Sequence, residues 1–276
     1  MRPKVILPNM FTAFSLSSGL FVIFRMNMLE PGAMTYTMLV ACICILLFAV
    51  FLDFIDGAIA RIIHAETEFG GVFDSMADAV SFGVAPAALV LKALSLAAGT
   101  LPSFFLAMGA MVYSISGVLR LVRFTVTAHE IQGDKEQMAL AKTHFTGLPI
   151  TAAAACLIST VLLLSSESFR AHFSLSEESA AWISIAAFFI LGFFMVSSWK
   201  FPSMKCLRFK VGSFLVVAGI AAMAALVFAG ALNYFPFVFA AISWGYFFIS
   251  LILSCIRFIT GKRLQSLEDF DFSDED

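Results

Sequence analysis

Residues 53–78 read DFIDGAIARIIHAETEFGGVFDSMAD, with apolar sequence on both sides. The stretch holds four aspartates, Asp53, Asp56, Asp74 and Asp78. An ionised aspartate at the centre of a bilayer is unfavourable by roughly 3 kcal/mol, so four of them need a partner that offsets their charge. A bound cation is the natural partner. The cluster therefore predicts a functional site.

Composition identifies the class of protein. Of the 276 residues, 61% are apolar and 13% are charged, and the mean hydropathy is +0.95. These values exclude an ordinary water-soluble globule and predict an integral membrane protein. The net charge of −2 gives no strong field, so we expect no nucleic-acid partner. The five cysteines form no CxxC pair, which argues against a disulfide framework and a zinc site.

The apolar stretches predict the architecture. A helix needs about 20 largely apolar residues to cross a bilayer, and the chain offers eight such stretches. They lie near residues 10–27, 35–62, 73–96, 102–125, 147–165, 180–199, 211–230 and 236–258. We therefore predict an all-α fold, a polytopic membrane bundle of about eight transmembrane helices, in one domain of residues 1–260. Residues 261–276 are expected to form a disordered acidic tail in the cytoplasm.

The basic residues predict the orientation. Of the 17 Lys and Arg residues, 14 fall at the N-terminus, in the even-numbered connections or at the C-terminus. The positive-inside rule therefore places both termini and the aspartate cluster on the cytoplasmic side. In a bacterium this membrane would be the inner membrane.

The aspartates are spaced to form one pocket. Asp53 and Asp56 are three residues apart on the second predicted helix, and Asp74 and Asp78 are four apart on the third, so each pair projects from one helical face. Carboxylate oxygens without nearby thiols suit a hard divalent ion, either Mg²⁺ or Mn²⁺, with Ca²⁺ as a further occupant. One or two ions would fit four ligands.

Small residues flank the cluster and leave space beside it. Gly57, Ala60 and Gly70 carry little or no side chain, so a substrate or a second backbone can approach closely there. Two alternatives remain open for the acids themselves. They could form structural ion pairs with Arg61 and other basic residues, or they could line an ion pathway.

The order D-x₂-D-G-x₂-A-R-x₈-G-x₃-D-x₃-D resembles the motif of the CDP-alcohol phosphatidyltransferase family at every position. Further segments are similar to the members of that family that use serine as the acceptor alcohol. These segments are VSFGVAP at 80–86, LRLVRF at 119–124, FTGLP at 145–149, and MVSS at 195–198 leading to FPSMK at 201–205. One departure is Thr125, where the resemblance leads us to expect Asn.

The resemblance implies a reaction and roles for individual residues. It implies transfer of a phosphatidyl group from CDP-diacylglycerol to L-serine with release of CMP, assisted by Mg²⁺ or Mn²⁺, with Asp78 as general base and with a homodimer as the assembly. The residues expected to contact the CDP-lipid are Asn9, Thr12, Asp56, Gly57, Ala60, Arg61 and Gly70. The candidates for binding serine are Ser81, Arg120 and Arg123.

Each weaker candidate also has a structural alternative. Asn9 could cap the first helix at its N-terminus. Arg120 and Arg123 could be membrane-interface anchors, and Ser81 could bond a helix carbonyl.

Two rival functions are kept open. The first is a member of the same family with glycerol 3-phosphate, inositol or choline as the acceptor. The second is a divalent-cation transporter, against which the absence of a second copy of the motif argues. An archaeal ether-lipid donor also stays possible.

Overall fold

The computed structural model describes residues 3–63, 67–97, 99–130, 144–173, 175–197, 199–202 and 234–260. The chain divides into two compact units. The first comprises residues 1–130 and 148–197, and the second comprises residues 131–147 and 198–276.

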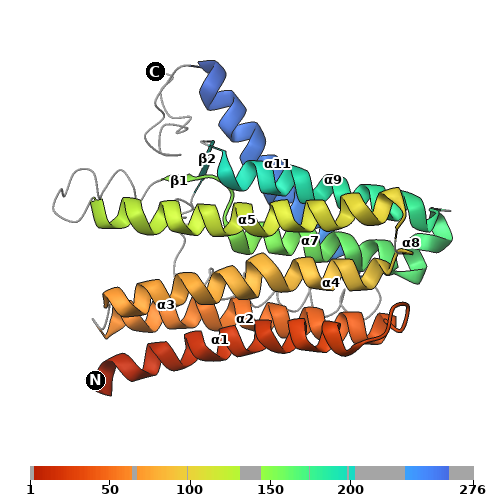
Figure 1. The fold of residues 1–276 in the computed structure, drawn as a ribbon. Coiled ribbons are helices and arrows are strands. Elements are labelled where there is room, and N and C mark those ends of the chain that lie inside the picture. Colours follow the sequence, from red (N-terminus) through yellow and green to blue (C-terminus); the bar gives the residue numbers. More distant parts are fainter. Residues whose placement is uncertain are drawn as a thin grey trace. The chain divides into compact units, whose positions relative to one another are not determined.

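The first unit is a bundle of helices (Figure 1). Its elements are α1 (Pro3–Met28), α2 (Tyr36–Ile62), α3 (Glu68–Asp78), the π-helix η1 (Ala79–Val84), α4 (Ala85–Leu94), α5 (Leu101–Glu130), α7 (Ile150–Ser165), α8 (Glu167–His172) and α9 (Glu177–Val196). The most extensive packing is between α5 and α9 and between α1 and α2. Short connections join α1 to α2 and α4 to α5, as expected for neighbouring helices in a bundle.

The observed helices confirm the predicted helical membrane bundle. Six helices in the described residues are long and apolar enough to cross a membrane, and the shorter apolar helix α7 is a seventh segment at a predicted position. These helices indicate an integral membrane protein. The short helix α8 was not predicted, because its six residues carry no apolar run. The predicted span at 211–230 and the acidic tail at 261–276 lie outside the described residues.

The second unit contains a feature that the hydropathy pattern did not predict. Strand β1 (His144–Thr146) pairs antiparallel with β2 (Lys200–Pro202), and β2 contacts helix α11 (Phe235–Thr260). Gly147 follows β1 with φ +85°, a left-handed conformation that favours glycine, and its N–H donates to the Trp199 carbonyl at 2.8 Å. The ribbon therefore joins parts of two segments, FTGLP and FPSMK. These segments lie far apart in the sequence, and both carry the family resemblance.

The third predicted span is one continuous rod in which the π-helix η1 separates α3 from α4. A π-helix pairs N–H and C=O groups five residues apart, as the Ala85 N–H does with the Val80 carbonyl. Pro86 has no N–H to donate to the Phe82 carbonyl four residues earlier. That carbonyl instead accepts from the Tyr113 hydroxyl of α5 at 3.0 Å. The next carbonyl, of Gly83, accepts from Ser114 at 2.9 Å.

Glycines let η1 approach its two neighbours closely. A Cβ atom on Gly19 of α1 would lie 2.6 Å from Ser81 Oγ and 2.7 Å from Ser81 Cα. On the α5 side, Gly117 and Gly83 face each other, and a Cβ on Gly117 would lie 2.9 Å from a methyl carbon of Ile150. The π-helix is thus held between α1 and α5 at backbone contact distance.

We expect Gly19→Ala to destabilise the protein and Gly245→Ala to leave it unchanged or slightly more stable. The added methyl at Gly19 meets the backbone of Ser81, and overpacking of this kind costs about 1–3 kcal/mol. No described atom lies within 4 Å of a Cβ added to Gly245 of α11, so alanine there gains helix propensity without a clash. The measurement is thermal unfolding of the two variants in the same detergent. Equal melting temperatures would contradict the close packing of α1 and η1.

Candidate active site

The four aspartates converge at one end of the first unit. One carboxylate oxygen from each of Asp53, Asp56 and Asp74 lies within 4.8 Å of the others. The Asp53 carboxylate is also close to those of Asp74 and Asp78. The structure thus brings together all four acids, two from the last turns of α2 and two from α3.

Helix α1 completes one side of the cluster. The Thr12 hydroxyl donates to Asp56 Oδ2 at 2.8 Å, and the Asp56 side chain is only 4% exposed. One turn earlier on α1, Asn9 Oδ1 would lie 3.3 Å from a Cβ atom on Gly70 of α3. The alternative interpretation of Asn9 as an N-cap is wrong, because α1 begins at Pro3 and Asn9 lies inside the helix. Thr12 and Asn9 therefore both face the cluster.

A threonine that the sequence analysis did not single out fixes the start of α3. Thr67 is the N-cap, and its side chain accepts a hydrogen bond from the Gly70 N–H at 3.0 Å. The signal was present in the sequence, because a threonine directly before an amphipathic run is a common helix start. Thr67 and Asn9 leave little room for a side chain at Gly70, where a Cβ would lie 3.1 Å from Thr67 Oγ1 and 3.3 Å from Asn9 Oδ1.

Gly57 differs from Gly70 in its surroundings. No described atom lies within 4 Å of a Cβ built on Gly57. Among the described atoms, the space beside Gly57 is therefore open, next in sequence to Asp56. The side chains of Ala60 and Arg61 lie outside the described residues, although both belong to α2.

The carboxylates have the donor set of a cation site. None of the four forms an ion pair with a Lys or Arg whose side chain the structure describes, so structural ion pairs within that part of the chain do not explain them. Among the described residues, Asp74 Oδ1 is buried without a hydrogen-bond partner. Neighbouring carboxylates repel unless a proton or a cation is shared between them. Clustered carboxylate oxygens suit a hard divalent ion. The buried Asp74 Oδ1, which has no hydrogen-bond partner among the described residues, is available as one of its ligands.

The candidates for serine binding are placed differently. The Ser81 hydroxyl is fully buried and donates to the Ser15 carbonyl of α1 at 3.0 Å, which agrees with its structural alternative. Arg123 donates to the carbonyls of Val196 and Ser197, at 3.0 and 3.4 Å, where α9 ends. Arg120, one turn before Arg123 on α5, is half-buried.

Thr125, the departure from the family pattern, lies close to the cluster. Its hydroxyl is 3.4 Å from the Ser75 hydroxyl, next in sequence to Asp74, and it donates to the Leu121 carbonyl of its own helix at 3.0 Å. The contact links α3 to α5. Threonine, in place of the expected Asn, therefore supplies the hydroxyl group of this contact.

Comparisons with known proteins agree with this geometry. A family model described as CDP-alcohol phosphatidyltransferase matches residues 5–194. A Helicobacter pylori protein named CDP-diacylglycerol–serine O-phosphatidyltransferase is 30% identical over 217 residues, which cover 79% of this chain and 80% of that protein. A Bacillus subtilis protein of the same name is 37% identical over 135 residues, 49% of this chain and 68% of that protein.

An archaeal relative extends the comparison. A Methanothermobacter thermautotrophicus protein named archaetidylserine synthase is 34% identical over 203 residues, 72% of this chain and 70% of that protein. The family match covers α1 to α9 and includes every aspartate of the cluster. The chain belongs to the CDP-alcohol phosphatidyltransferase family.

Proposed function

We propose that this protein transfers the phosphatidyl group of CDP-diacylglycerol to the hydroxyl of L-serine, giving phosphatidylserine and CMP. The observation that carries the proposal is the convergence of Asp53, Asp56, Asp74 and Asp78 beside the open space at Gly57. The acceptor is supported by the relatives, whose names share serine as the headgroup and differ in the lipid part.

The aspartates divide into two roles. Asp53, Asp56 and Asp74 hold one or two divalent ions, Mg²⁺ or Mn²⁺, with Thr12 fixing the rotamer of Asp56 through its 2.8 Å hydrogen bond. When bound, such an ion neutralises the pyrophosphate and stabilises the charge that develops on the departing CMP. Asp78 adjoins Asp53 and shares in this coordination.

Asp78 is also the group we assign as general base. A serine hydroxyl is a weak nucleophile at neutral pH, so a carboxylate within hydrogen-bonding reach must take its proton as the new bond forms. The serine oxygen then bonds to the phosphorus that carries the diacylglycerol, and the bond from that phosphorus to the CMP oxygen breaks. The proton passes to Asp78, and CMP leaves with the electron pair of the broken bond.

The donor fits between helices. Asn9 and Thr12 of α1 line one side, and Gly57 and Ala60 of α2 leave room for the nucleotide, with Arg61 as a cation for its phosphates. Gly70 lets α3 approach α1 so that this side stays closed. The acyl chains remain in the bilayer while the charged head lies at the membrane surface, on the cytoplasmic side by the positive-inside rule.

Arg120 is the residue we assign to the serine carboxylate. Arginine offers a planar fork that matches a carboxylate. Arg123, which also donates to the carbonyls that end α9, and Ser81, which also donates to α1, stay with Arg120 as the proposed contacts of serine, as the family resemblance implies.

The acceptor is tested by CMP release from the purified protein in detergent. With CDP-diacylglycerol and Mn²⁺ or Mg²⁺, we expect CMP with L-serine and none with glycerol 3-phosphate, inositol or choline. Detergent removes any gradient, so turnover also separates an enzyme from a transporter. Release with another alcohol would keep the family chemistry and refute the serine acceptor, and no release with any alcohol would support transport.

Replacing the proposed base should separate turnover from binding. Asp78→Asn is expected to lower kcat by about 10²–10⁴-fold, the usual contribution of a general base. Its affinity for CDP-diacylglycerol should stay within tenfold of the wild-type value, because Asp53, Asp56 and Asp74 remain. Asp74→Asn is the comparison variant and should lose both properties. Normal turnover in Asp78→Asn would remove Asp78 from this role.

Metal binding can be measured without turnover. We expect Asp74→Asn to weaken Mn²⁺ binding at least tenfold, about 1.4 kcal/mol, since the buried Oδ1 loses its charge. Glu68→Gln is the matched control, an exposed acid at the start of the same helix. Free Mn²⁺ is counted by electron paramagnetic resonance during titration of each protein. Equal loss in both variants would mean that the cluster is not the site.

A further inference from the structure

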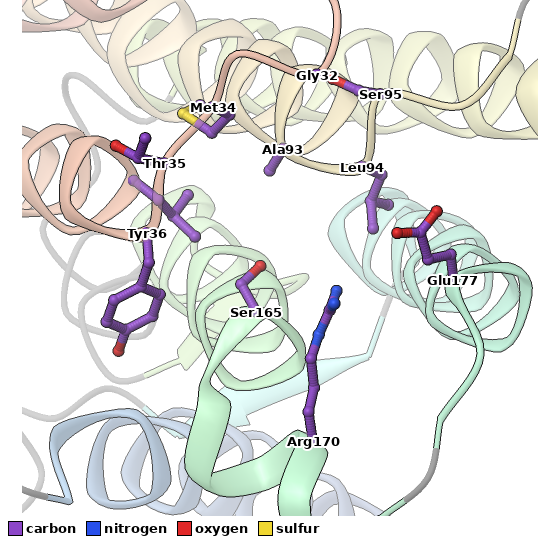
Figure 2. A pocket seen from close by; sticks show the side chains of 11 residues that line it. Gly32, Met34, Thr35, Tyr36, Ala93, Leu94, Ser95, Ser165, Arg170 and Glu177 are labelled. Carbon is purple, nitrogen blue, oxygen red and sulfur yellow. The ribbon is translucent and has the colours of Figure 1, made fainter.

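A cavity lies in the first unit, far from the aspartates. Its volume is about 330 Å³, and it is bordered by the turn between α1 and α2 and by the adjoining ends of α2, α4, α7, α8 and α9 (Figure 2). Tyr36 at its edge and Asp53 of the cluster are both on α2, and 17 residues of helix span roughly 25 Å. That distance is close to the hydrocarbon thickness of about 30 Å. The cavity therefore lies near the membrane surface opposite the active site.

Two exposed side chains of opposite charge, Arg170 and Glu177, line the cavity. Figure 2 shows the Arg170 side chain extending from α8 toward the space between Ser165 and Glu177. Arg170 Nε donates to the Leu164 carbonyl at 2.9 Å, which fixes the plane of the guanidinium group. Within the described ranges, its two terminal nitrogens and the Glu177 carboxylate have no hydrogen bond or ion pair.

The arrangement suits a ligand that carries both signs of charge. A guanidinium group held by its Nε presents its remaining N–H groups to a phosphate, which arginine binds with charge-assisted hydrogen bonds. A carboxylate on the other side of the cavity suits an ammonium group. The Ser165 hydroxyl adds a polar group between them. A volume of about 330 Å³ is within the range of small-molecule sites.

We propose that this cavity binds the headgroup of a zwitterionic phospholipid from the leaflet opposite the active site, with the phosphate at Arg170 and the ammonium group at Glu177. The surroundings favour a lipid over a soluble ion. Phe173, three residues after Arg170, and Trp182, five residues after Glu177, are 56% and 41% exposed, so the segments that carry the two charges also present apolar surface to acyl chains. Aromatic side chains are typical of the level at which headgroups lie.

The inference is independent of the proposed reaction. A headgroup in this cavity cannot reach the aspartates across the membrane, so the bound lipid is neither donor nor acceptor in transfer. Its expected effect is on the stability of the fold, because a ligand that binds only the folded state stabilises it. Failure of the serine assay would leave this inference standing, and the reverse holds as well.

The test uses delipidated protein in detergent with EDTA, so that no cation recruits phosphates to the aspartate cluster. Phosphatidylethanolamine, phosphatidylglycerol and diacylglycerol with matched chains are titrated, and bound lipid is counted by native mass spectrometry. We expect phosphatidylethanolamine to bind most tightly, phosphatidylglycerol more weakly and diacylglycerol least. Soluble phosphoethanolamine should compete only at much higher concentration if the acyl chains contribute.

The variants assign the two ends of the headgroup. Arg170→Gln should weaken binding of both phospholipids about tenfold, and Glu177→Gln should remove the preference for phosphatidylethanolamine while keeping phosphatidylglycerol binding. The matched controls are Arg25→Gln at the end of α1 and Glu178→Gln beside Glu177, neither of which lines the cavity. Unchanged lipid binding in Arg170→Gln, or equal losses in the controls, would refute the proposal. Unchanged melting of the lipid-free variants verifies that they are folded.

Discussion

Mutual repulsion among four carboxylates is the constraint on which the rest of this structure depends. Asp53 is close to both Asp74 and Asp78, and Asp56 and Asp74 supply further oxygens within 4.8 Å. Such a cluster costs free energy in a membrane protein, and packing must hold it in place until a cation or a proton offsets the charge. The Thr12 hydrogen bond to Asp56 and the Thr67 cap on α3 are parts of that restraint. Thr12 on α1 and Thr67 at the start of α3 therefore help to hold the acids together, and neither carries a charge that would neutralise them.

The segment after Asp78 continues the restraint. Its VSFG sequence supported a serine acceptor through family resemblance, yet in the structure these residues pack the π-helix between α1 and α5. Ser81 meets Gly19, and Gly83 meets Gly117. Because Pro86 removes a donor, the Phe82 carbonyl is available to Tyr113, which ties η1 to α5 one turn after the proposed base. The motif therefore also has a packing role directly after Asp78.

The helices and the convergence of the acids could be predicted from the sequence because both follow from periodicity. Residues three or four apart share a helical face, and apolar runs of about 20 residues define spans. The short ribbon of β1 and β2 could not be predicted in this way, because its three-residue strands are stabilised by pairing between distant segments. Asn9 was ambiguous because the start of α1 depends on residues before the apolar run. The partners of Arg123 were also hidden, since they are backbone carbonyls at the end of another helix.

The two glycines beside the cluster differ in their surroundings. At Gly70 the space beside the backbone is crowded, because oxygens of Thr67 and Asn9 would lie 3.1 and 3.3 Å from a Cβ. At Gly57 the space is left open among the described atoms. The same residue type therefore closes the α1–α3 side and opens the α2 side. Asp56, next in sequence to Gly57, accepts a hydrogen bond from Thr12 of α1 at 2.8 Å and is only 4% exposed, so its carboxylate is held on the α1 side.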